Sequence, residues 1–261
     1  MRIPFFKYQG TGNDFVIIDQ RANKYIKATN QALIEQMCDR RFGIGADGLM
    51  LIEPSDQTDF EMVYFNADGR TSSMCGNGGR CIVHLAARLG IFADQCTFDA
   101  IDGVHEARVE KDGSVALKMN DVSTIHKDKE AYVLDTGSPH YVRFEKRVAA
   151  LDMVHEGRSV RFSEDYKEDG INVNLVEWQD DVLQVRTYER GVEDETFSCG
   201  TGVVASAISL AQQVKNIMDH VDILTKGGKL KVSFEKIDGT YQNIWLIGPA
   251  TYVYEGVFTT V

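Results

Sequence analysis

The sequence has little that would mark a membrane, secreted or disordered protein. No apolar run reaches the roughly 18–20 residues that a transmembrane helix needs, and the start of the chain is too soon polar for a signal peptide. Only four prolines occur in 261 residues, and there is no Ser/Gly-rich linker or low-complexity tract. The five cysteines are irregularly spaced and odd in number, which disfavours a disulfide framework. We therefore expect a reduced, cytoplasmic, globular protein.

Positive charge is also scarce. The chain has 39 acidic residues against 28 basic ones, a formal net charge of −11. Nucleic acids and anionic membranes are bound by clustered cations, so neither is an expected partner. Hydrophobic residues make up 43% and charged residues 26%, which is ordinary for a globular protein with a substantial core.

The motifs of common cofactor sites are absent or out of context. Gly43-Ile-Gly-Ala-Asp-Gly48 matches the dinucleotide pattern G-x-G-x-x-G, but that pattern is meaningful only after a strand and before a helix. Here a predicted helix over 31–40 precedes it and a predicted strand over 49–52 follows. No Cys-x-x-Cys pair indicates zinc, and no lysine lies in a setting typical of pyridoxal phosphate. The sequence thus predicts neither a metal nor a cofactor.

The chain does contain an internal repeat. Three short strings recur in the same order, 124 or 125 positions later, in the second half. The pairs begin at Thr11 and Thr136, at Leu51 and Leu175, and at Cys75 and Cys199. We interpret them as two structurally similar lobes. The N-terminal lobe, with Cys75, covers residues 1–117 together with a returning C-terminal strand over 250–261, and the C-terminal lobe, with Cys199, covers 118–249.

Local patterns give the same architecture in both halves. Predicted strands over 60–65 and 182–188 each lead to a turn, then to Cys-Gly-x-Gly, and then to an apolar helix over 81–89 or 203–211. Further strands are predicted over 15–19, 131–134, 229–234 and 243–247. The predicted fold is α+β, with two pseudo-symmetric lobes, each a mostly antiparallel sheet or barrel wrapped around a central helix.

The two Cys-Gly-x-Gly turns suggest a chemistry. A cysteine at the first turn of a helix has its thiolate favoured by the helix dipole, and the neighbouring N–H groups can bind a carboxylate. Two such turns could place a thiol on each face of an amino-acid α-carbon. One thiolate would remove the α-proton and the other thiol would return one, which is racemisation or epimerisation by two bases. Two buried structural cysteines are the alternative.

Eight strings along the sequence form a recognisable pattern: Gly12-Asn-Asp-Phe15, Phe42-Gly-Ile-Gly-Ala-Asp47, Phe65-Asn-Ala-Asp-Gly69, Met74-Cys-Gly-Asn-Gly-Gly-Arg-Cys81, Gly137-Ser-Pro-His140, Ile171-Asn-Val173, Tyr188-Glu-Arg-Gly191 and Ser198-Cys-Gly-Thr-Gly202. They resemble the motifs of the diaminopimelate epimerase family over nearly the whole chain. The resemblance implies cofactor-independent interconversion of LL- and meso-diaminopimelate, an amino-acid biosynthesis step toward lysine and peptidoglycan precursors, by a homodimeric isomerase.

The resemblance also assigns roles to residues. Cys75 and Cys199 are the expected acid and base, and His140 and Glu189 are expected to tune the pKa of the thiols. Four residues are the expected backbone cradle of the reacting carboxylate: Gly76, Asn77, Gly200 and Thr201. Five more are expected substrate ligands: Asn13, Asn66, Asn172, Glu189 and Arg190. Asn66 as a turn former, His140 as a core histidine and Arg190 as a surface ion pair remain the alternatives.

Two positions depart from the family pattern. Gly48 stands where the family often has Gln, and Ser138 stands where it often has Asn. Each change removes an amide that would touch substrate, so a water, a neighbouring side chain or a slightly different substrate must account for it. Gly48 lies 124 positions before Asn172, and the repeat therefore predicts that Gly48 lines the site.

Two other functions remain open from the sequence. A related two-cysteine racemase acting on proline or hydroxyproline would not need Arg190, because an imino acid has no distal head group. A non-catalytic amino-acid-binding protein or a thiol-redox protein would show no exchange of the α-proton.

Overall fold

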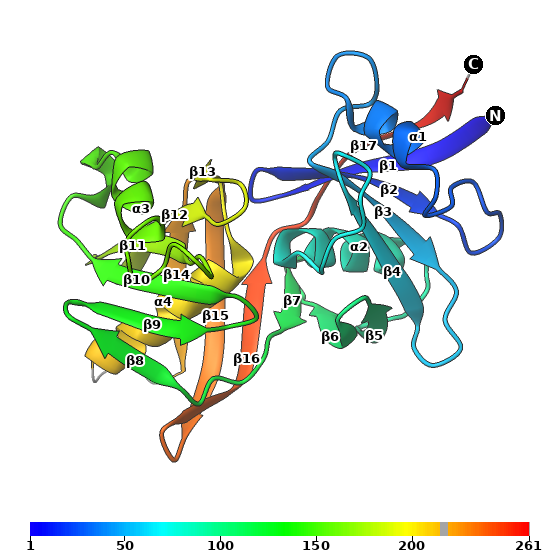
Figure 1. Ribbon diagram of the computed structural model, residues 1–261. Helices are drawn as coiled ribbons and strands as arrows, with labels where there is room; N and C mark the ends of the chain where they lie inside the picture. The colour runs from blue at the N-terminus through cyan, green and yellow to red at the C-terminus, as the bar shows by residue number, and fades with distance from the viewer. Residues whose placement is uncertain (215–218, 261) are drawn as a thin grey trace. The chain divides into compact units, whose positions relative to one another are not determined.

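The computed structural model describes residues 1–214 and 219–260, which form two units (Figure 1). The first unit contains Met1–Leu117 and the chain from Pro249 onward, and the second contains Lys118–Gly248. Both are built mainly of strands with few helices, which confirms the α+β class. We call them the N-terminal and the C-terminal lobe.

The N-terminal lobe has eight described strands and two helices. Its elements are β1 (Arg2–Gly10), β2 (Asn13–Asp19), α1 (Gln31–Cys38), β3 (Gly48–Glu53), β4 (Phe60–Asn66), α2 (Gly76–Arg88), β5 (Gln95–Ala100), β6 (Gly103–Val109), β7 (Val115–Lys118) and β17 (Thr251–Thr259). The strands pair in the order β17-β1-β2-β3-β4-β5-β6-β7, so the last strand of the chain pairs with the first.

The C-terminal lobe follows the same plan. Its elements are β8 (Ile125–Asp128), β9 (Ala131–Asp135), β10 (Pro139–Phe144), the short 3₁₀ helix η1 (Val148–Ala150), α3 (Met153–Arg161), β11 (Asn172–Gln179), β12 (Val182–Glu189), β13 (Asp194–Thr196), α4 (Gly200–Gln213), β14 (His220–Thr225), β15 (Gly228–Ile237) and β16 (Thr240–Gly248). The main order is β8-β9-β10-β11-β12-β14-β15-β16.

The two strand orders match pair by pair. In the N-terminal lobe β2–β3 and β4–β5 are parallel and the other pairs are antiparallel. In the C-terminal lobe the corresponding pairs β10–β11 and β12–β14 are parallel and the rest of the main order is antiparallel. The pseudo-symmetry predicted from the repeat is therefore confirmed within the folds of the lobes.

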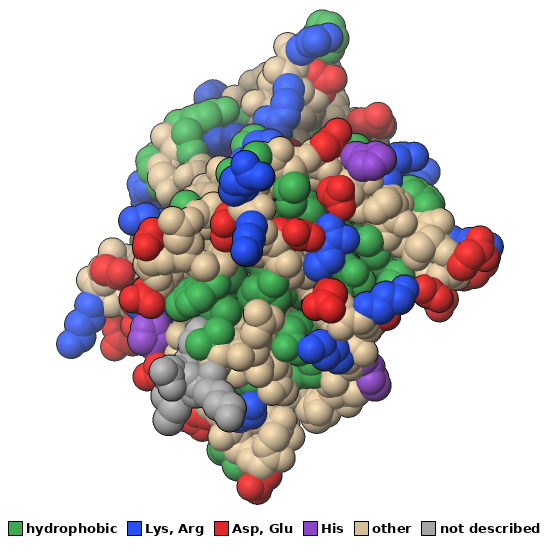
Figure 2. All heavy atoms as spheres, turned by 90° about the vertical axis from the view of Figure 1, so that its left-hand side faces the viewer, with side chains coloured by type: hydrophobic (Ala, Val, Ile, Leu, Met, Phe, Trp, Pro, Cys, Tyr) green, Lys and Arg blue, Asp and Glu red, His purple; other side chains and the backbone are tan. Residues whose placement is uncertain are grey.

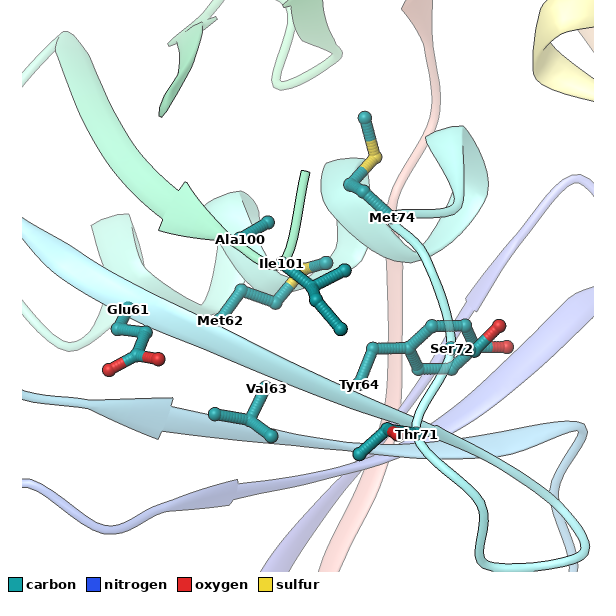
Figure 3. A pocket seen from close by; sticks show the side chains of 9 residues that line it. All are labelled: Glu61, Met62, Val63, Tyr64, Thr71, Ser72, Met74, Ala100 and Ile101. Atoms are coloured by element: carbon teal, nitrogen blue, oxygen red, sulfur yellow. The ribbon is translucent and has the colours of Figure 1, made fainter. Parts of the chain in front are cut away.

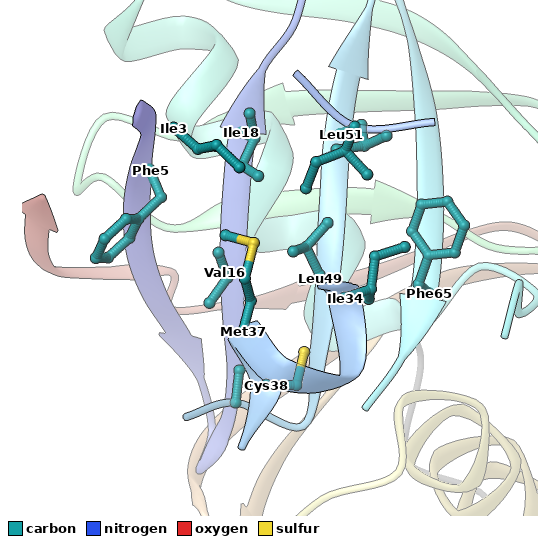
Figure 4. Packing of buried hydrophobic residues seen from close by; sticks show 12 residues of the cluster. Ile3, Phe5, Val16, Ile18, Ile34, Met37, Cys38, Leu49, Leu51 and Phe65 are labelled. Atoms are coloured by element: carbon teal, nitrogen blue, oxygen red, sulfur yellow. The ribbon is translucent and has the colours of Figure 1, made fainter. Parts of the chain in front are cut away.

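Central strands of each lobe, such as β2, β3 and β11, are buried on both faces of the sheet. In the N-terminal lobe Val16 and Leu49 face helix α1, whose Ile34 and Met37 fill the space between them (Figure 4). The other face holds Phe15, which lies against α2. Strands that are buried on both faces read as continuous apolar runs, as β2 and β3 do.

Helix α4 is the central helix of the C-terminal lobe, and most of its residues are buried. It contacts β10, β11, β12, β14, β15 and β16. Two buried serines lie within it, and their hydroxyls donate to carbonyls one turn earlier: Ser206 to Gly202 at 2.7 Å and Ser209 to Ala205 at 2.8 Å. The two hydroxyl groups inside this helix are thereby satisfied. Helix α3 covers the other face with Met153.

The surface carries charges of both signs. In Figure 2, acidic and basic side chains are interspersed over the face that is turned toward the viewer. Ion pairs such as Arg143–Glu156 at 2.7 Å and Arg186–Glu195 at 2.7 Å link neighbouring elements of the C-terminal lobe. None of the described helices is long and apolar enough to cross a membrane.

Candidate active site

Three strands of the N-terminal lobe bring their polar residues to the start of α2. Phe15 of β2 is the register partner of Gly48 in β3, and Gly48 is the partner of Asn66 in β4. Because side chains alternate along a strand, Asn13 projects to the same face as Phe15. Phe15 lies against Gly78 of α2, so this face is the one that meets the helix that follows Cys75.

Cys75 is the residue that begins α2. Its backbone is extended (φ −105°, ψ 127°), and its carbonyl accepts the first helical hydrogen bond from the Gly79 N–H at 2.7 Å. The first N–H groups of a helix have no partner inside the helix, and they carry the positive end of its dipole. The half-buried Cys75 thiol therefore lies where a negative charge is favoured.

Asn13 is held beside this thiol in a fixed orientation. Its Nδ2 donates to the Asp47 carboxylate at 2.5 Å, so its Oδ1 faces the Cys75 sulfur at 3.6 Å. Arg40 bridges Asp47 and Asp14, with 2.7 Å to each. Lys7 pairs with Asp14 at 2.7 Å and also donates to the Gly45 carbonyl. The carboxylate that orients Asn13 is therefore part of a network of charges.

This charge network also affects Asp14. Burial raises the pKa of the Asp14 carboxyl, but hydrogen bonds from Arg40 and Lys7 outweigh the burial and hold the pKa at about 2. Asp14 is therefore ionised throughout the neutral range, and it keeps both cations in place.

Arg80 fixes the loop at the start of α2 from within the lobe. The side chain is fully buried, and its guanidinium donates to four oxygens, none of them a carboxylate. These are the Asn77 Oδ1 at 2.9 Å, the Thr11 Oγ1 and the Gly76 carbonyl at 3.2 Å each, and the Pro249 carbonyl at 3.4 Å. Burial lowers the pKa of Arg80 from its ordinary value. The Asn77 amide oxygen is thus held by hydrogen bonds within the lobe.

The C-terminal lobe repeats the arrangement at α4. Cys199 is extended (φ −113°, ψ 113°) and its carbonyl accepts from the Val203 N–H at 2.9 Å. Thr201 of the first turn lies with its Oγ1 3.5 Å from the Cys199 sulfur. Thr136 donates to the Thr201 carbonyl at 2.8 Å, just as Thr11 in the other lobe contacts Asn77 at 3.2 Å. In both lobes the repeated threonine, Thr11 or Thr136, thus forms a hydrogen bond with a residue in the first turn of the helix that follows the cysteine.

His140 is linked to Cys199 through Thr201. Asn174 donates from Nδ2 to the Tyr141 carbonyl at 3.2 Å and accepts from the Thr187 hydroxyl at 2.9 Å, which fixes the direction of its amide. The same Nδ2 lies 3.1 Å from the His140 Nδ1, so Nδ1 is an acceptor and the ring proton is on Nε2. Nε2 then donates to the Thr201 hydroxyl at 2.9 Å.

The imidazole is neutral in this setting. His140 is fully buried, and burial, together with the nearby positive charge of Arg190, lowers its pKa from 6.5 to about 3. A neutral ring that donates to Thr201 leaves the threonine proton free to point at the sulfur of Cys199. A hydrogen bond given to a thiolate stabilises the thiolate.

Asn172, predicted to bind substrate, contacts chiefly its own lobe. Its Nδ2 donates to the Ser138 Oγ at 2.9 Å and the Pro139 carbonyl at 3.1 Å, and its Oδ1 accepts from the Arg190 N–H at 2.9 Å. One lone pair of the amide oxygen remains for a ligand. Asn172 thereby joins the strand that carries His140 to the turn that carries Arg190.

Two more of the predicted residues, Glu189 and Arg190, lie at the end of β12 and on the turn that follows it. Glu189 ends β12, and burial raises the pKa of its carboxyl. The Arg190 side chain is exposed, and its Nη1 donates to the Asp169 carbonyl at 2.9 Å. Asn66 of the other lobe is exposed at the end of β4.

Four residues next to these sites had no role in the sequence analysis: Asp47, Tyr64, Arg80 and Asn174. Asp47 and Arg80 lie inside motifs that were recognised, and a charged residue on an apolar helix is a signal that could have drawn attention to Arg80. Asn174 follows Asn172 by two positions on a buried strand, where an amide needs partners. Tyr64 gave no signal beyond strand propensity.

The other three cysteines, Cys38, Cys81 and Cys96, are buried, and none of the five cysteines forms a disulfide. Among residues 1–214 and 219–260, no group of three or more His, Cys, Asp or Glu side chains is arranged to hold a metal ion.

Solved structures with the same fold include isomerases. A phenazine biosynthesis protein of the PhzF family from Bacillus anthracis matches with a TM-score of 0.77 at 14% identity, covering 100% of both chains. A hydroxyproline epimerase from Agrobacterium vitis matches with a TM-score of 0.67 at 11% identity, covering 98% of this chain and 92% of the other. At these identities the likeness shows the fold alone, which is two-lobed.

The sequence comparisons define the family. The family model of diaminopimelate epimerase matches residues 5–125 and 132–253. A diaminopimelate epimerase from Flavobacterium psychrophilum is 47% identical over 251 residues, which cover 96% of this chain and 98% of the relative. One from Chlorobaculum tepidum is 41% identical over 259 residues, covering 96% and 99%. The chain belongs to the diaminopimelate epimerase family of isomerases, as its motifs predicted.

Proposed function

We propose that this protein interconverts LL- and meso-diaminopimelate without a cofactor, with Cys75 and Cys199 as the acid–base pair. The observation that carries the proposal is the repeated placement of a half-buried thiol at the start of an apolar helix, once in each lobe, in a chain of this family. The thiolate of one cysteine removes the α-proton. The thiol of the other delivers a proton to the opposite face of the same carbon, so the configuration inverts and the protonation states of the two cysteines are exchanged.

The weakly acidic α-proton leaves only if the developing carbanion is stabilised. The N–H groups that follow each cysteine are suited to this role, because helix starts bind carboxylates and fixed dipoles act strongly where water is excluded. Gly76 and Asn77 supply them in the N-terminal lobe, and Gly200 and Thr201 in the C-terminal lobe. In our proposal they hold the reacting carboxylate as its negative charge grows.

The surroundings of the thiols supply the tuning. The Thr201 hydroxyl, which accepts from the neutral His140, donates to Cys199 when that residue is a thiolate. Asn13 offers its oxygen to Cys75 at 3.6 Å, which favours the thiol form of that residue. Glu189, whose pKa is raised by burial, lies on the turn beside Arg190 and Asn172.

The distal end of the substrate carries a second ammonium and carboxylate. Asn13, Asn66 and Asn172 offer amide groups that can read both charges, and the exposed Arg190 offers a guanidinium suited to a carboxylate. We propose these four residues, with Glu189, as the substrate ligands.

Proton NMR in D2O tests the proposal. The reduced protein is incubated with LL-diaminopimelate, without pyridoxal phosphate, while the α-proton signal and the appearance of the meso form are followed. We expect both exchange and epimerisation, and we expect Cys75→Ala and Cys199→Ala each to lose epimerisation. Cys96→Ala, a buried thiol in the N-terminal lobe, is the matched control. Turnover of hydroxyproline in place of diaminopimelate, or an active double alanine variant, would contradict the proposal.

We further propose that the protein is a cytoplasmic homodimer that acts in lysine and peptidoglycan-precursor biosynthesis. Five cysteines outside any disulfide, two of them reactive by position, suit a reducing compartment. Light scattering coupled to size-exclusion chromatography tests the dimer, and growth of a depletion strain with and without added lysine and meso-diaminopimelate tests the pathway. A monomer at micromolar concentration, or unchanged growth, would contradict these two statements respectively.

A further inference from the structure

Tyr64 occupies the space that a side chain at position 48 would fill. A Cβ atom built on Gly48 would lie 2.6 Å from Cε2 of the Tyr64 ring and 3.0 Å from its hydroxyl oxygen. It would also lie 2.6 Å from the Phe65 carbonyl. Carbon atoms do not approach this closely, so the position of the ring depends on a glycine at 48. The phenol thus lies directly over the backbone of β3.

The ring belongs to the face of the sheet that carries the candidate site. Tyr64 precedes Asn66 by two positions on β4, so both project to one face. Its ring packs edge-on against Phe15, with centroids 6.0 Å apart, and Phe15 lies against Gly78 in the first turn of α2. Figure 3 shows the ring extending from β4 in a pocket that it lines together with Met74, the residue before Cys75. Tyr64 is half-buried, with part of its surface exposed.

The C-terminal lobe shows what position 48 corresponds to. Gly48 is the first residue of β3 and pairs with Phe15 of the parallel strand β2. Asn172 is the first residue of β11 and pairs with His140 of the parallel strand β10. The two positions are therefore equivalent. The C-terminal lobe has the amide side chain of Asn172 at this position. The N-terminal lobe has Gly48, which lacks a side chain, and the phenol ring of Tyr64 takes up the space beside it.

We propose that Tyr64 is a specificity-determining residue, whose hydroxyl contacts the distal amino-acid head of the substrate. This inference rests on the proposed function. In that function the helix-start N–H groups hold the reacting carboxylate, which leaves the distal ammonium and carboxylate to be read by side chains. A phenol can accept from an ammonium and donate to a carboxylate. The ring also limits the space above β3, which restricts the length of the ligand.

The expected signature is a change in binding rather than in chemistry. A contact made equally in the ground state and the transition state lowers KM and leaves kcat unchanged. Tyr64→Phe keeps the ring that packs on Gly48 and Phe15 and removes only the oxygen. We expect it to raise KM for LL-diaminopimelate about tenfold, with kcat within about threefold of the parent. Tyr64→Leu also removes the ring and should raise KM further.

The experiment measures kcat and KM of the parent, Tyr64→Phe and Tyr64→Leu, with Tyr132→Phe as the matched control. Tyr132 is a half-buried tyrosine of β9 in the other lobe. Calorimetric titration of Cys75→Ala and of the Cys75→Ala, Tyr64→Phe double variant with LL-diaminopimelate measures the same contact without turnover. Both readouts use Tyr64→Phe, so the result does not depend on the folding of Tyr64→Leu.

The outcomes separate this inference from the proposed function. A rise in KM and in Kd for Tyr64→Phe, with Tyr132→Phe unchanged, supports it. Parent-like KM and Kd for Tyr64→Phe in an active enzyme overturn the role of Tyr64 while the proposed function stands. A fall in kcat alone also overturns it, because it would assign the hydroxyl to the chemical step. A parent protein that neither exchanges the α-proton nor binds diaminopimelate overturns the proposed function, and this inference with it.

Discussion

The Nε2 atom of His140 donates a hydrogen bond to the Thr201 hydroxyl over 2.9 Å, and that hydroxyl lies 3.5 Å from the sulfur of Cys199. The direction of the first bond is set by Asn174, whose amide donates to the other ring nitrogen. A buried neutral histidine thus determines which way a threonine proton points, and it does so without touching the sulfur.

Removing the Thr201 hydroxyl should slow the reaction. Thr201→Val keeps the shape of the side chain and the carbonyl that Thr136 binds, but it removes the donor to the Cys199 thiolate. Hydrogen bonds to charged groups contribute about 1.5–3 kcal/mol, so we expect kcat to fall roughly 10–100-fold. Thr201→Ser retains the hydroxyl and should stay within a few-fold of the parent. Steady-state kinetics of the parent and the two variants measure this. Equal losses of kcat in Thr201→Val and Thr201→Ser would rule out the hydroxyl as the cause.

The buried His140 should make stability depend on pH. Its pKa is about 3 in the folded protein against an ordinary 6.5, so below pH 6.5 the unfolded chain binds a proton that the folded chain excludes. Stability contributed by the neutral ring is fully present above pH 6.5. It is lost as pH falls toward 3, by about 1.4 kcal/mol for each pH unit.

Urea unfolding from pH 7.5 to 4.5 measures this slope. His84, whose pKa is also lowered by burial, adds to it, and Glu189, whose pKa is raised, opposes it. The comparison is therefore with His140→Asn, whose free energy of unfolding should fall less steeply with decreasing pH than that of the parent. Parallel curves for the two proteins would show that His140 titrates normally in the folded state.

Asp47 should act through Asn13. Asp47→Ala removes the carboxylate that accepts from the Asn13 amide at 2.5 Å, which frees the amide to rotate beside Cys75. We expect kcat/KM to fall about tenfold, the size of one charge-assisted hydrogen bond. Asp47→Asn keeps one acceptor oxygen and should recover most of the loss. Steady-state kinetics measure kcat/KM of the two variants, and thermal unfolding shows whether each is folded. A folded Asp47→Asn protein that does not recover activity would contradict a positioning role.

Loss of the buried Arg80 side chain should lower the free energy of unfolding more than loss of an exposed arginine on the same helix. Arg80→Met leaves the Asn77 amide oxygen and neighbouring buried acceptors without their donor, at a cost of about 2–4 kcal/mol. Arg88→Met on the same helix is the matched control. Its side chain is 44% exposed and stacks on Tyr252 at 4.0 Å, so we expect a loss of about 1 kcal/mol or less. Equal free energies of unfolding for the two variants would contradict this assignment.

The plan of the fold could be predicted from the sequence because it depends on signals that are local or repeated. The apolar runs of β2, β3 and α4 and the two Cys-Gly-x-Gly turns are legible in a single sequence. The predicted helix over 31–40 ends earlier, at Cys38, because Asp39 is extended and its carboxylate caps the backbone N–H groups of Arg41 and Phe42. Helix α3 was missed, since it is polar on average and is held by packing against β11 and β12.

The sequence could not predict which side chains form hydrogen bonds or packing contacts with one another across strands. Asn172 was expected to bind substrate, yet three of its hydrogen bonds go to Ser138, Pro139 and Arg190, which only the strand register brings together. Tyr64 was not singled out at all, because its relation to Gly48 exists across two strands and not along one. Side-chain contacts between strands depend on register, and register is a property of the folded sheet.

Because β17 pairs with β1, the two lobes can complete their folds at different stages of chain synthesis. The C-terminal lobe is one continuous stretch and can begin to fold once its last strand, β16, has been synthesised. The N-terminal lobe, although it is made first, lacks an edge strand and the Pro249 carbonyl that Arg80 binds until the final residues emerge. Two lobes with one architecture are thus completed in the reverse of the order in which they are translated.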